Sequence, residues 1–182
     1  IPWLFSQTVN EDSWEILKMS LKFCSIPIRH GIIKALLRIR KQRPTLRVSD
    51  DIIAQNIERE IGRYSKLKKA LSFYQSGKVS LSDKADEILG YEIEQTFENM
   101  FRLLSLNNDI DDIDNAFKAI TGDSLRLRSD AIEFIENLIK WDVRKLLIPI
   151  LETYHTESIP PNNFSSSMTN TEDVLYFLKE IC

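Results

Sequence analysis

The feature that most constrains the fold is an internal repeat of two helical stretches, offset by 99 positions. Apolar residues recur every three or four positions over 14–39 and again over 113–138, the period of an amphipathic helix. Each stretch reads as a helix, a short turn and a second helix, and an apolar–Arg pair that ends in Arg29 or Arg128 lies early in that second helix. Two such helices cannot bury both apolar faces alone, so the repeat predicts stacked helical hairpins.

The same period predicts helices along most of the remaining chain. The expected helices cover residues 11–24, 27–43, 50–75, 82–106, 111–121, 124–140 and 142–155. The chain of 182 residues has only 5 Gly and 6 Pro, too few for a turn-rich barrel, and no alternating stretch of convincing strand length. The predicted fold class is therefore all-α, with a single helical-repeat domain over residues 1–156.

The C-terminal part is expected to differ from this domain. Residues 157–170 contain Pro160 and Pro161 among several Ser and Asn, a composition typical of a loop or linker. Apolar periodicity returns over residues 171–182 and continues to the last residues, which predicts the start of a further helix. Together with a first residue that is not Met, this predicts a fragment of a longer protein.

The sequence contains no pattern that a catalytic, metal or cofactor site requires. His30 and His155 lack partners at metal-ligand spacing. The acidic cluster that starts at Asp109 has Asp114 and Ile120 where a calcium loop needs Gly and Glu, so helix capping explains it better. Phosphate-binding glycine loops and nucleophile elbows are also missing. We therefore predict no catalytic residue, no metal, no cofactor and no small-molecule substrate.

One basic group could contact phosphate. It consists of Arg38, Arg40, Lys41, Arg43 and Arg47. Most of these residues fall at the end of a predicted helix, where the helix dipole favours cations, so a solvated helix terminus is the competing interpretation. No aromatic residues alternate with them for base stacking, and the net charge of −3 gives no general attraction to nucleic acid. A nucleic-acid-binding helical repeat that uses residues 38–47 is therefore the alternative function rather than the first.

Several stretches within residues 101–152 carry a family resemblance. They are RLLSL at 102–106, residues 109–116, RSDAIEFIENL at 128–138 and LLIPILE at 146–152. This region resembles the HEAT-like part of bacterial proteins related to the nucleotide (ATP/ADP) translocases, and residues 28–44 look like an earlier repeat of it. The transporter spans and the cyclic-nucleotide cassette found in those proteins have no counterpart in this sequence.

The resemblance implies an α-α superhelix, a HEAT-like or armadillo-type solenoid. In HEAT repeats an Arg early in the second helix bonds to an acidic group or a carbonyl of the adjacent repeat. Arg29 and Arg128 are the matching residues, and Asp123 is the acid expected to accompany Arg128, whereas the first repeat lacks an acid at that position.

The expected function is a non-catalytic protein-interaction or scaffold domain. Its partner would be another domain of the parent chain or a separate protein, and aromatic residues are frequent anchors of such contacts. Trp14 has core spacing, whereas Trp3 and Trp141 lie near helix ends and are candidates for partial exposure. By resemblance, the domain would lie at the cytoplasmic face of a membrane and reach that membrane only through its parent protein.

Overall fold

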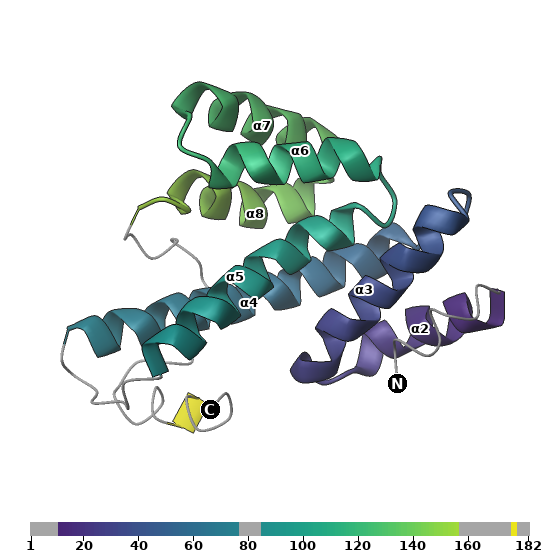
Figure 1. Cartoon of the computed structure of the whole chain (residues 1–182), viewed down its shortest axis with the longest axis horizontal. Coiled ribbons are helices and arrows are strands. Elements are labelled where there is room, and N and C mark those ends of the chain that lie inside the picture. The colour runs from purple at the N-terminus through teal and green to yellow at the C-terminus, as the bar shows by residue number, and fades with distance from the viewer. Residues whose placement is uncertain (1–10, 77–84, 157–175, 178–182) are drawn as a thin grey trace.

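The computed structural model describes residues 11–76, 85–156 and 176–177, and within these ranges the chain is helical and has no strand (Figure 1). The helices are α2 (Glu11–Phe23), α3 (Ile26–Gln42), α4 (Asp50–Gln75), α5 (Ala85–Leu104), α6 (Ile110–Thr121), α7 (Leu125–Leu138) and α8 (Trp141–Thr153). The predicted all-α class is confirmed. The expected linker at 157–170 lies outside the described residues, and so does most of the expected last helix.

Local sequence signals set several of the helix ends. The side chain of Asp109 accepts hydrogen bonds from the backbone N–H groups of Asp111 and Asp112, at 2.9 and 3.1 Å, and so caps α6. Ser124 caps α7 in the same way, through the N–H of Leu127. The acidic cluster thus performs the capping role predicted for it, and no group of acidic, His or Cys side chains among the described residues could hold a metal ion.

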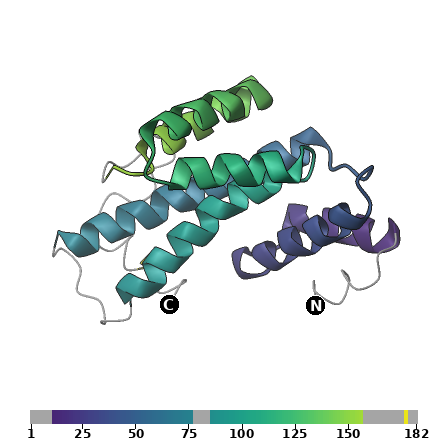
Figure 2. The same ribbon diagram turned by 45° about the horizontal axis from the view of Figure 1, so that its top comes forward.

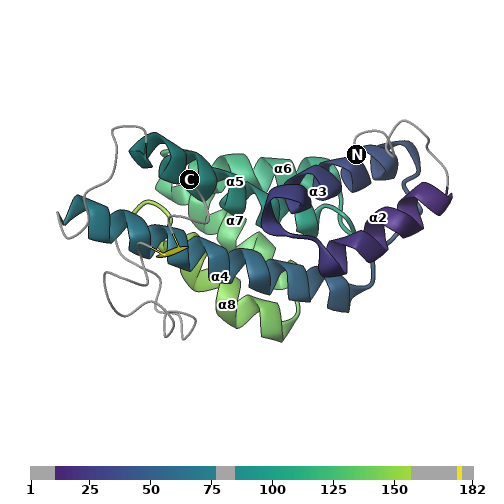
Figure 3. The same cartoon turned by 90° about the horizontal axis from the view of Figure 1, so that it is seen from below.

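The long hairpin of α4 and α5 forms the centre of the molecule. On one side, α2 packs against α4 and α3 packs against α5 (Figure 3). On the other side, α6 packs against α5 and α8 packs against α4, while α7 lies over α6 and α8, away from the central hairpin (Figure 2). The first two hairpins therefore stack with their first helices together (α2 on α4) and their second helices together (α3 on α5). Beyond α5 this order changes, since α8 rather than α6 packs against α4.

One continuous core connects these layers. Phe97 on α5 is fully buried, and its ring contacts Tyr64 of α4, Phe101 of α5, Phe117 of α6 and Tyr154 just after α8. The Phe97 and Tyr154 rings stack, with their centroids 4.2 Å apart. Aromatic residues from four segments thus hold the central hairpin and the C-terminal helices together.

Equivalent positions of the internal repeat are buried in both hairpins. Trp14 and Leu21 face the core from α2, and Ile113 and Ile120 occupy the matching positions on α6. The prediction that Trp14 belongs to the core is confirmed. No helix within the described ranges combines the length and the apolar character that a bilayer crossing requires.

Candidate interaction cleft

A cleft of about 610 Å³ lies between the N-terminal end of α4 and the connection from α7 to α8. Apolar side chains make up much of its floor: Ile53, Ile57, Leu104, Leu138 and Val143. Its lining also includes polar and charged residues: Arg47, Ser49, Asp50, Asn107, Asn108 and Lys140. We call this feature the α4–α8 cleft.

Asn107 positions the α4 side of this cleft. Its Nδ2 donates to the carbonyl of Val48 at 2.6 Å and to Asp50 at 3.0 Å, and its Oδ1 accepts from the N–H of Val48 at 3.0 Å. The amide therefore satisfies both backbone groups of Val48, whose side chain is buried. The segment that leads into α4 is thereby fixed to the segment that follows α5.

An ion pair crosses the cleft from α4 to the start of α8. The Nζ of Lys140 lies 3.0 Å from a carboxylate oxygen of Asp50. Hydrogen bonds from Lys140 and then from Asn107 lower the pKa of Asp50, and the same bond to Asp50 raises the pKa of Lys140. Both side chains are exposed to solvent, so this pair adds little stability and separates readily.

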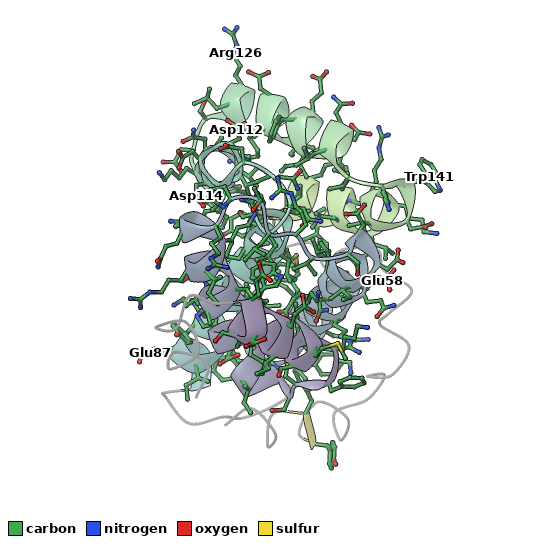
Figure 4. All side chains as sticks on the ribbon, turned by 90° about the vertical axis from the view of Figure 1, so that its right-hand side faces the viewer. Glu58, Glu87, Asp112, Asp114, Arg126 and Trp141 are labelled. Carbon is green, nitrogen blue, oxygen red and sulfur yellow. The ribbon has the colours of Figure 1, made fainter. Side chains whose placement is uncertain are left out.

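Trp141 follows Lys140 directly and projects from the molecule beside the cleft. It is the first residue of α8, and its side chain is 70% exposed, pointing outward in Figure 4. On the neighbouring helix α7, Leu127 and Phe134 are also exposed and lie seven positions apart, on one helix face. The sequence-based suggestion that Trp141 is partly exposed is confirmed, whereas Trp3 lies outside the described residues.

The structure disperses the basic group at 38–47. Arg40 is buried, its Nε donates to the carbonyl of Leu106 at 3.0 Å, and burial lowers its pKa. Arg43 lies 3.8 Å from the Glu11 carboxylate, and Arg47 bonds to backbone carbonyls of its own loop. Arg38 and Lys41 are exposed on α3.

Acidic residues also lie beside this basic group. A hollow of about 420 Å³ brings Arg40 and Lys41 together with Asp109 and Asp111 of the α6 cap region. The region therefore presents both signs of charge.

The two repeat arginines make related contacts. Arg29 is buried, and its guanidinium donates to Glu60 of α4 at 2.9 Å and to the carbonyl of Cys24 at 3.5 Å. Arg128 donates to the carbonyl of Gly122 at 2.8 Å, so both arginines reach back to the turn of their own hairpin. Asp123 is exposed, and none of the ion pairs described here joins it to Arg128.

A buried polar network between α3, α4 and α5 was not predicted from the sequence. Asn99 lies at its centre, with its Oδ1 at 2.8 Å from the Nδ1 of His30 and its Nδ2 at 3.4 Å from Glu60. Arg102 pairs with Glu98 and also approaches His30. The available signal was the position of Glu60, which falls on the apolar face of its helix.

His30 is a packing residue of this network rather than an isolated surface histidine. Burial lowers its pKa, and the charges of Lys34 and Arg102 act in the same direction, against the hydrogen bond to Asn99. Neutral His30 thus fits a site that already holds two cations.

Comparison with known proteins adds no relative. No protein-family model matches the chain, and no curated protein or solved structure matches it either. The resemblance to the translocase-related HEAT-like region therefore stays a prediction.

Proposed function

We propose that this chain is a non-catalytic protein-interaction module whose α4–α8 cleft receives a segment of a protein partner. The observation that carries this proposal is the exposure of Trp141 beside a cleft with an apolar floor. Tryptophan is enriched among the residues that dominate binding energy in protein interfaces. An apolar centre with a polar rim is also the usual composition of an interface.

The polar residues of the cleft suit a peptide ligand. Lys140 and Asp50 offer one charge of each sign, and their mutual bond is exposed and weak. A partner segment that carries either charge can replace one member of the pair while its apolar side chains cover the floor. Recognition would then depend on shape and on the Trp141 ring, and no bond of the ligand would be broken or formed.

The finer architecture and the parent protein belong to the same proposal. The like-on-like packing of α2 on α4 and of α3 on α5 supports a HEAT-like solenoid, as do the parallel contacts of Arg29 and Arg128. In a translocase-related parent, the module would act as a scaffold on the cytoplasmic side. Its ligand would be another domain of that parent or a separate protein.

Peptide display on the whole chain tests the proposal. Segments selected on the wild type should bind Trp141→Ala at least ten-fold more weakly, because that substitution removes the exposed ring beside the cleft. The matched control is Tyr91→Ala, which removes an aromatic ring that is 59% exposed on α5 and should leave the affinity unchanged. Titration calorimetry provides the affinities.

Two results would contradict the proposed function. One is a selection that yields only segments whose affinity is the same for wild type and Trp141→Ala. The other is an equal loss of affinity in Trp141→Ala and Tyr91→Ala, which would indicate adhesion to exposed aromatic rings in general. Thermal unfolding of each variant should match wild type, because both side chains are mostly exposed.

A further inference from the structure

Helix α2 has a second apolar face, which points away from the core. Ile16, Met19 and Phe23 lie on it, with 47%, 49% and 82% of their surfaces exposed. The opposite face of the same helix buries Trp14, Leu17 and Leu21. At 3.6 residues per turn, Ile16, Met19 and Phe23 form one continuous stripe, which no described residue buries.

Charged residues along α2 are divided between its two halves. Glu11, Asp12 and Glu15 occupy the first half, and Lys18 and Lys22 occupy the second. Glu15 and Lys22 are seven positions apart, so they lie along the same edge of the apolar stripe, about 10 Å from each other along the helix axis. The Nζ of Lys18 already bonds to one carboxylate oxygen of Glu15 at 2.6 Å.

We propose that the stripe on α2 docks against the same stripe of a second copy of this chain, with the two helices antiparallel. A two-fold axis between positions 18 and 19 then places Glu15 beside Lys22 of the second copy, and Lys22 beside its Glu15. The surface is self-complementary in charge as well as in apolar character, as an isologous interface requires. A parallel arrangement would instead bring the two acidic halves together.

The helix dipoles favour the same arrangement. In an antiparallel pair the positive N-terminal end of each α2 lies beside the negative C-terminal end of the other. The contact involves three apolar side chains on a helix of 13 residues, which is less than a standard interface contains. The dimer is therefore weak, and its population depends strongly on protein concentration.

Sedimentation velocity across a range of concentrations tests the dimer. Wild type should shift from monomer to dimer as the concentration rises, and Met19→Asp should stay monomeric. The matched control is Leu127→Asp, which places the same charge on the exposed face of α7 and should dimerise like wild type. Trp141→Ala should also dimerise normally, so this proposal and the proposed function can fail independently.

Charge reversal tests the antiparallel register. Glu15→Lys alone should weaken the dimer at least ten-fold. The new lysine at position 15 of each copy would then lie beside Lys22 of the other copy, so two repulsive pairs form. Adding Lys22→Glu should restore the affinity, since each pair is then reversed but opposite in sign. A wild type that stays monomeric at every concentration overturns the proposal, as does a dimer that Met19→Asp leaves intact. A double variant as weak as Glu15→Lys overturns the antiparallel pairing.

Discussion

Arg29 joins the first hairpin to the second through an ion pair that is almost entirely removed from water. Its guanidinium and the Glu60 carboxylate expose 7% and 2% of their side-chain surfaces. Removing one partner of a buried pair leaves the other charge without compensation, which is costly. The pair therefore makes the packing of the α2–α3 hairpin against the α4–α5 hairpin dependent on both residues at once.

Glu60→Ala should lower the free energy of unfolding by about 3–5 kcal/mol, because it leaves the Arg29 guanidinium buried and unpaired. The double variant Arg29→Met with Glu60→Leu should lose less, since neither buried charge remains. Urea unfolding followed by circular dichroism measures both changes. A double variant less stable than Glu60→Ala alone would show that the charge pair is not the source of the effect.

At the scale of single elements, Gly90 and Gly122 have opposite roles. Gly90 lies within α5, and a Cβ atom there would meet nothing within 4 Å. Gly122 follows α6, and a Cβ atom there would come within 3.0 Å of the carbonyl oxygen of Lys118. Gly90 lowers the stability of α5 although the space around it would accept a side chain. At Gly122 the missing side chain avoids a close contact with the last turn of α6.

Gly90→Ala should therefore raise the free energy of unfolding by about 0.5–1 kcal/mol, because alanine restricts the unfolded chain and fits the helix. Gly122→Ala is the matched comparison and should lower it, because the new methyl group crowds the backbone of α6. Thermal and urea unfolding of the two single variants give the comparison. Equal changes at the two sites would contradict this account of the glycines.

At the scale of the whole molecule, stability should be highest in the central hairpin. Helices α4 and α5 contact each other and both outer layers, whereas α7 packs mainly against α6 and α8 (Figure 1). Hydrogen exchange followed by mass spectrometry should show the slowest amides within residues 50–75 and 89–104, and faster exchange within 125–138. Protection of α7 equal to that of α4 would contradict a hierarchy set by these contacts.

Sequence periodicity was sufficient for the helices but not for their assembly. Apart from the start of α5, whose predicted position at residue 82 lies outside the described residues, the helix ends fall within two residues of their predicted positions, because the period and the caps are local properties. The partner of Arg29, the burial of Arg40 and the place of α8 against α4 depend on contacts between distant segments. A single sequence gives no signal for such contacts.

The candidate site was predictable to a similar extent. The exposure of Trp141 followed from its place near a helix end, and the capping role of Asp109 followed from its spacing. The cleft beside Trp141 could not be predicted, since Asn107 and Lys140 reach it from opposite sides and are far apart in the sequence. The exposed stripe on α2 was also missed, because periodicity marks apolar residues without showing which face a neighbour covers.

The hydrogen bonds of Asn107 determine which wall of the α4–α8 cleft can move when a ligand binds. The Asn107 amide donates two hydrogen bonds and accepts one, and these tie the start of α4 to the segment that follows α5, so this wall is rigid. On the facing wall, Lys140 reaches across through a single exposed ion pair. A bulky ligand would therefore widen the cleft by displacing the start of α8, and Trp141 would move with it. The aromatic ring that we propose as the anchor of a partner segment would thus report, through its fluorescence, how far the cleft has opened.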